Sequence, residues 1–150
     1  MLSQHSIDTT TMRIITASIE KSNMVPQAIY AQLEIPLLEN NNKRQFYNIL
    51  PLDIDTLDIN LKYMPEFKEK SKFENIKLNA TIKDDIKTAI QKCLNTHQNL
   101  KLRAIAFDII LSPKGPIIIE ANYNWDISLL YRAFDHKQKN NIAKVWLESL

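Results

Sequence analysis

The sequence predicts a single α+β domain over residues 1–150, built on an antiparallel sheet with helices packed on one face. Three observations predict this fold class. The length of 150 residues is that of one ordinary domain. Apolar segments of strand length fill the first part of the chain, and an apolar pattern with helical spacing follows them. A Ser-Pro-Lys-Gly turn then joins two more apolar segments, as in an antiparallel hairpin.

Four strands are predicted before the helix, two on each side of an Asn-rich loop at Leu38–Arg44. They are Met12–Ser18, Ala28–Ile35, Phe46–Leu52 and Thr56–Leu61. The first two are expected to pair antiparallel across the polar segment Glu20–Pro26, and the last two flank an Asp-rich turn.

A helix is predicted from Thr81 to about His97, with the Thr81 hydroxyl as N-cap and Asp84 and Asp85 in the first turn. Apolar residues recur at core-facing spacing: Ile82, Ile86, Ala89, Ile90, Cys93 and Leu94. Cys93 is therefore interpreted as a buried small hydrophobe and not as a nucleophile, because His97 is expected to fall beyond the end of the helix.

Two further helices are predicted near the end of the chain, Ile127–Asp135 and Ile142–Leu150. Asn140 and Asn141 separate them, and Asp126 is expected to be the N-cap of the first.

The hairpin strands are predicted as Ile105–Leu111 and Pro116–Ala121, joined by a three-residue loop that ends at Gly115. With that loop, counting back from the turn places Asp108 opposite Glu120. Side chains alternate along a strand, so Asn122 should lie on the same face as Glu120.

Asp108, Glu120 and Asn122 thus form a candidate metal site. Carboxylate and amide oxygens suit a hard cation such as Mg²⁺, and two facing carboxylates need a cation or a basic partner. The alternative is an ordinary half-buried hairpin with Asp108 at its edge and Glu120 in solvent. Both acids interrupt or end strongly apolar runs, and this favours the metal site.

The segment that carries these residues, AFDIILSPKGPIIIEAN, resembles the metal-binding hairpin of the ATP-grasp superfamily. It is most similar to the hairpin of ATP-grasp proteins associated with sugar transfer and polysaccharide biosynthesis. The resemblance implies that the chain is a C-terminal ATP-grasp lobe. It also implies that Asp108, Glu120 and Asn122 are ligands of Mg²⁺ or Mn²⁺, with Glu120 bridging two ions, and that ATP is the cofactor.

A second segment, TTTMRIITA, resembles an N-terminal strand of the same family. Thr11, Arg13 and Thr16 occupy matching positions, while Thr10 stands where Asn is usual. The resemblance implies that Thr11 and Arg13 bind the nucleotide and that Arg13 is catalytic, stabilising the transferred phosphoryl group. The alternative is that Arg13 is a surface residue or a structural partner of Asp108 or Glu120. His5 is interpreted as a flexible terminal residue.

The implied activity is ATP-dependent ligation of a carboxylate, with an amine or other nucleophile, through an acyl phosphate. The implied partners are ATP and a small carboxylate or sugar-linked substrate. Gly115 is the single glycine, so the chain lacks a Gly-rich loop over the phosphates. A missing N-terminal lobe or partner chain is expected to supply it, and this chain alone to be inactive. The alternatives are a degenerate, non-catalytic lobe acting as an interaction module and an unrelated α+β binding domain.

Composition excludes several other classes. A net charge of +2 and a pI near 8.6, without a basic patch interleaved with aromatics, argue against nucleic acid. The apolar runs are too short for a membrane span, and no secretory signal opens the chain. The single cysteine fits a reducing compartment, so a cytoplasmic location is expected.

Overall fold

The computed structural model describes residues 10–18, 25–37, 46–61, 73 and 76–125. Within these residues the elements are β1 (Thr11–Ser18), β2 (Pro26–Leu37), β3 (Phe46–Leu52), α3 (Ala80–Leu100), β4 (Ala104–Ser112) and β5 (Gly115–Asn122). The strands form one sheet in the order β3-β2-β1-β4-β5, and every neighbouring pair is antiparallel. The predicted α+β class is confirmed, as is the antiparallel pairing of the first two strands.

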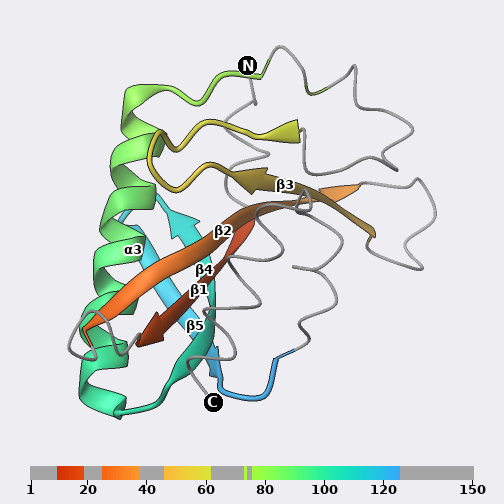
Figure 1. Ribbon diagram of the computed structural model, residues 1–150. Coiled ribbons are helices and arrows are strands. Elements are labelled where there is room, and N and C mark those ends of the chain that lie inside the picture. Colours follow the sequence, from red (N-terminus) through yellow and green to blue (C-terminus); the bar gives the residue numbers. More distant parts are fainter. Residues whose placement is uncertain (1–9, 19–24, 38–45, 62–72, 74–75, 126–150) are drawn as a thin grey trace.

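Helix α3 packs on one face of the sheet, and Figure 1 shows it lying along that side in green. The core lies between them, because alternate residues of each strand point to the same side. Its fully buried members include Met12, Ile14, Leu33, Leu50, Ile86, Cys93, Phe107 and Ile109. Burial also raises the pKa of the Cys93 thiol to about 12, so the prediction that Cys93 is a buried hydrophobe is confirmed.

The helix begins earlier and ends later than predicted. Asn79, not Thr81, is the N-cap, because its side-chain oxygen accepts a hydrogen bond from the Ile82 N–H at 2.9 Å. The helix continues to Leu100 and ends at Lys101, which has a left-handed conformation with φ of 54°. His97 is therefore inside the helix, one turn after Cys93, and the prediction that it falls beyond the end is wrong.

His97 ties the last turns of α3 to the sheet, and its side chain is fully buried. Its Nε2 lies 2.6 Å from the Leu102 carbonyl oxygen, which can only accept, so Nε2 carries the hydrogen. Nδ1 then accepts from the Thr16 hydroxyl at 2.6 Å. Burial lowers the pKa of His97, and the hydrogen bond to Leu102 opposes that shift only in part.

The predicted strand Thr56–Leu61 is wrong. Its first residues belong to a turn in which Asp53 Oδ1 accepts from the Asp55 and Thr56 N–H groups at 3.0 and 2.8 Å. Leu57 follows with φ of 56°. Within Thr56–Leu61, the only strand pairing described is one isolated bridge between Leu52 and Ile59. The aspartate side chain takes the place of a strand partner for the local N–H groups.

Asp108 pairs with Glu120 as predicted, but the loop of the hairpin is shorter than predicted. Ser112 pairs with Gly115, so the loop consists of Pro113 and Lys114 alone and not the three residues predicted. A register shift next to Asp108 moves the pairing by one residue, so that Asp108 still lies opposite Glu120. Lys92 Nζ donates to the Pro116 carbonyl at 2.8 Å and holds the hairpin against α3.

Replacing Gly115 by alanine is expected to lower the free energy of unfolding by about 1 kcal/mol. The cause is backbone strain alone, because Gly115 has φ of +98° and an added Cβ would meet no atom within 4 Å. Urea unfolding measures the loss, and Gly115→Asn should lose less because asparagine tolerates positive φ better. Equal losses in the two variants would contradict this account.

The predicted loop Leu38–Arg44, the predicted helices Ile127–Asp135 and Ile142–Leu150, and the interpretations of His5 and Asp126 lie outside the described residues. In the part of the chain that is described, no helix is both long and apolar enough to cross a membrane.

Candidate functional site

A row of polar side chains crosses the sheet on the face opposite α3. Arg13 on β1 pairs with Gln32 on β2 and with Asp108 on β4, and Asp108 pairs with Glu120 on β5. Directly paired residues of antiparallel strands point to the same side. Gln32, Arg13, Asp108 and Glu120 therefore form one line perpendicular to four strands, which we call the polar row.

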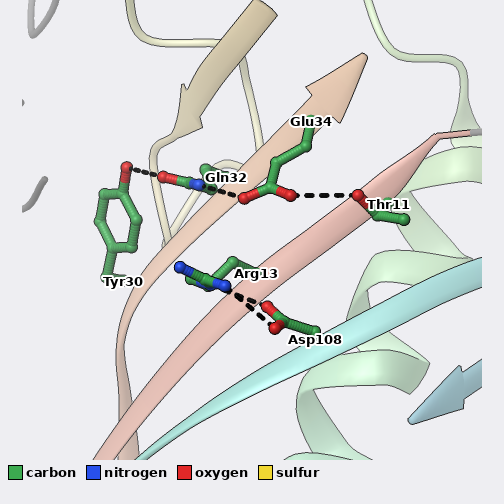
Figure 2. Close-up of polar contacts among 6 residues, drawn as sticks. All are labelled: Thr11, Arg13, Tyr30, Gln32, Glu34 and Asp108. Carbon is green, nitrogen blue, oxygen red and sulfur yellow. Dashed lines mark hydrogen bonds and ion pairs between the residues drawn. The ribbon is translucent and has the colours of Figure 1, made fainter. Parts of the chain in front are cut away.

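Arg13 and Asp108 form a two-point ion pair at the centre of the polar row. Arg13 Nε and Nη2 donate to the two Asp108 carboxylate oxygens at 2.7 and 2.9 Å (Figure 2). Their side chains are only 27% and 16% exposed, so the pair is partly shielded from water. Arg13 is thus a structural partner of Asp108, the alternative that the sequence offered.

The charge around Arg13 is unbalanced. The hydrogen-bonded Asp108 does most to raise the pKa of Arg13, and the charges of Glu34 and Glu120 raise it further, against a lowering by burial. One guanidinium therefore interacts with three carboxylates. Additional positive charge beside Glu34 or Glu120 would stabilise these carboxylates.

Glu34 is held in place by a chain of hydrogen bonds beside the polar row (Figure 2). The Tyr30 hydroxyl donates to Gln32 Oε1 at 2.5 Å, and Gln32 Nε2 donates to Glu34 Oε1 at 2.6 Å. The Thr11 hydroxyl donates to Glu34 Oε2 at 3.1 Å. Tyr30 and Gln32 are buried, and burial raises the pKa of Tyr30, with the Glu34 charge adding to that shift. Tyr30 is therefore a neutral donor at physiological pH.

The predicted metal ligands lie on one face, as the sequence indicated. Asp108 pairs with Glu120, and the neighbouring pair on the same face joins Ala106 to Asn122. Glu120 is exposed and Asn122 is partly exposed, so both can reach a ligand from solvent. The described residues contain no group of three or more His, Cys, Asp and Glu side chains suited to a metal. A cation here would need the Asn122 amide oxygen and ligand oxygens in addition to the two carboxylates.

The two threonines of the N-terminal pattern lie on opposite faces. Thr11, predicted to bind nucleotide, lies on the face of the polar row and donates to Glu34. Thr16 lies on the helix side, where it is fully buried and bonded to His97. Alternation along β1 accounts for this difference, because the two residues are an odd number of positions apart and the pairing of β1 with β4 runs through them without a register shift.

Sequence reasoning missed the contribution of β2. Tyr30, Gln32 and Glu34 alternate with Ala31, Leu33 and Ile35, a period of two that places the three polar residues on one face. That signal was available from the sequence. Their proximity to Arg13 was not, because it depends on the register between β1 and β2.

No protein-family model, curated protein or solved structure matches the chain. The resemblance to the ATP-grasp superfamily therefore rests on the hairpin segment Ala106–Asn122 and the strand segment Thr9–Ala17.

Proposed function

We propose that the chain is the Mg²⁺-ATP-binding lobe of an ATP-dependent ligase that joins a carboxylate to an amine or another nucleophile. The proposed setting is polysaccharide or cell-surface biosynthesis, as the hairpin resemblance implies. The observation that carries the proposal is the polar row, in which Asp108 faces Glu120 and accepts two hydrogen bonds from Arg13. Two acids and one planar cation on the sheet face opposite α3 suit a phosphate-bearing ligand.

The donor set fits a hard divalent cation. Asp108, Glu120 and Asn122 would hold it through oxygen atoms, the ligands that Mg²⁺ and Mn²⁺ prefer. A bound cation would neutralise phosphate charge during transfer. Carboxylate oxygens have more lone pairs than the two that Arg13 engages, so the ion pair leaves coordinating capacity on Asp108.

Arg13 supplies the second element of the proposal. Its bonds to Asp108 use Nε and Nη2 and leave other N–H groups of the fork for a second acceptor. A guanidinium in this position can bind phosphoryl oxygens and stabilise the charge that develops on them. No serine, cysteine or histidine nucleophile is needed for that chemistry.

A second candidate is a non-catalytic lobe that acts as an interaction module. The observation that favours it is that both Asp108 oxygens already accept from Arg13. In such a lobe the ion pair would be purely structural, and a divalent cation would have no effect on nucleotide binding.

Calorimetric titration with ATP, in Mg²⁺ and in EDTA, separates the two candidates. We expect weak binding that requires Mg²⁺, since the chain has one glycine and no Gly-rich loop. Glu120→Gln should weaken the Mg²⁺-dependent binding about tenfold or more, as expected for loss of a metal ligand or its partner. Asp55→Asn, which changes an exposed carboxylate in a distant turn, is the control and should bind normally. Equal affinity for ATP in Mg²⁺ and in EDTA would favour the interaction module.

In EDTA, Glu120→Gln is expected to change the free energy of unfolding by less than about 0.5 kcal/mol, with any change towards higher stability. Glu120 is exposed and faces Asp108, so the substitution removes repulsion by that carboxylate without opening a cavity. Loss of the attraction between Glu120 and Arg13 offsets part of this gain. Thermal melts of both proteins in EDTA provide the measurement. A large destabilisation would identify Glu120 as a structural residue.

A further inference from the structure

Arg13 lies between carboxylates from its two neighbouring strands. Asp108 on β4 holds the guanidinium by two hydrogen bonds, while Glu34 on β2 interacts with it through charge. Figure 2 shows the side chains of Arg13, Glu34 and Asp108 on the same face of the sheet. Glu34 and Asp108 come from the two strands that flank β1. The guanidinium therefore has two possible anionic partners without leaving this face of the sheet.

The Glu34 carboxylate is oriented by two hydrogen bonds and can accept more. Gln32 donates to one of its oxygens and Thr11 to the other, which fixes the carboxylate from two directions. Each oxygen receives one hydrogen bond from these residues, so each keeps a lone pair for another donor. Glu34 remains partly exposed, whereas Gln32 beneath it is buried.

A divalent cation at Asp108 would conflict with the present position of Arg13. The cation and the guanidinium repel each other, and both need the same carboxylate. Asp108 has lone pairs for both, but repulsion between the two positive charges favours movement of the guanidinium away from Asp108 as the cation binds, towards a second carboxylate that stabilises it. Glu34 meets that need from β2, the strand that flanks β1 on the side away from β4.

Building on the proposed function, we propose that Glu34 is a positioning residue for Arg13. When a divalent cation engages Asp108 and Glu120, the guanidinium shifts its pairing from Asp108 to Glu34 and stays on this face of the sheet. In EDTA the guanidinium is expected to stay paired with Asp108, as an internal counterion. Thr11 and Gln32 serve this exchange by holding Glu34 in the receiving orientation.

Mn²⁺ binding without nucleotide, followed by electron paramagnetic resonance, tests the exchange through a double-mutant cycle. Arg13→Gln should tighten Mn²⁺ binding about fivefold, because it removes the competing cation. Glu34→Gln should weaken binding about fivefold in the wild-type background and much less in the Arg13→Gln background. Thr11→Val should weaken it in the same direction by a smaller factor, since it removes one of the bonds that orient Glu34.

Two results would overturn this proposal and leave the proposed function standing. Equal weakening by Glu34→Gln in both backgrounds would show that Glu34 acts on the cation directly and not through Arg13. Weaker Mn²⁺ binding by Arg13→Gln would show that Arg13 supports the cation site instead of competing for it. Thermal melts in EDTA give the second readout, in which Glu34→Gln should change the melting temperature far less than Asp108→Asn. Failure of Mn²⁺ to bind any variant, the wild type included, would refute the proposed function as well.

Discussion

Replacing Asp108 by asparagine is expected to lower the free energy of unfolding in EDTA by about 2 kcal/mol. Arg13 would lose a two-point ion pair in which both side chains are mostly shielded from water, and asparagine offers it one neutral oxygen. The same substitution should abolish divalent-cation binding, because it removes a proposed ligand. Urea unfolding in EDTA and calorimetry with Mn²⁺ measure the two effects separately.

The chain offers a matched control for this experiment. Asp58 pairs with Lys83 at 2.6 Å, a distance similar to that between Arg13 and Asp108, but Asp58 is well exposed. The hydrogen bond from Lys83 lowers the pKa of Asp58, yet exposed pairs of this kind contribute little to stability. Asp58→Asn should therefore destabilise much less than Asp108→Asn and leave cation binding intact. Equal destabilisation by the two variants would contradict the shielded ion pair.

Replacing His97 by alanine is expected to lower the free energy of unfolding by about 3 kcal/mol, the largest effect among these predictions. The imidazole is fully buried and links the end of α3 to Thr16 on β1 and to the carbonyl of Leu102. Its loss leaves a cavity and removes one partner from three polar groups: the Thr16 hydroxyl, the Leu102 carbonyl and the Ser18 hydroxyl, which lies 3.2 Å from Nε2. Chemical unfolding at pH 7 measures the effect, and a loss below about 1 kcal/mol would contradict the described packing.

His97 also predicts how stability depends on pH. Burial holds its folded-state pKa below the ordinary value of 6.5, so the unfolded chain binds a proton more readily. The stabilisation from the neutral ring is complete above pH 6.5. It declines as the pH falls through 6.5 towards the lower folded-state pKa. Wild type should thus lose more stability between pH 7 and pH 5 than His97→Gln, which cannot titrate there. Parallel pH profiles of the two proteins would disprove the assignment.

Much of the fold could be predicted because the sequence signals are local. The alternation in β1 and β2 and the turn residues of the hairpin each specify a strand within a few residues. The errors arose where a side chain competed with the backbone pattern. The Asn79 side chain, and not that of Thr81, accepts a hydrogen bond from the Ile82 N–H at the start of α3. The Asp53 side chain accepts from the Thr56 N–H and stabilises a turn where a strand was expected.

The candidate site was predictable only in part. Pairing of Asp108 with Glu120 follows from the hairpin, but the predicted loop was one residue too long and the register shift beside Asp108 compensated for it. Arg13 was identified as a candidate, whereas its bonding to Asp108 depends on the pairing of strands 95 residues apart. Glu34 was missed for the same reason, because sequence patterns do not specify long-range register.

The most direct test of the central claim is to locate bound Mn²⁺ by its paramagnetic broadening of amide signals in the isotope-labelled protein. The account predicts selective broadening of the signals of 106–110 and 118–122, lost in Asp108→Asn, with little effect on the acidic turn at Asp53–Asp58. Broadening centred on that turn, or persisting unchanged in Asp108→Asn, would contradict a cation site on the polar row.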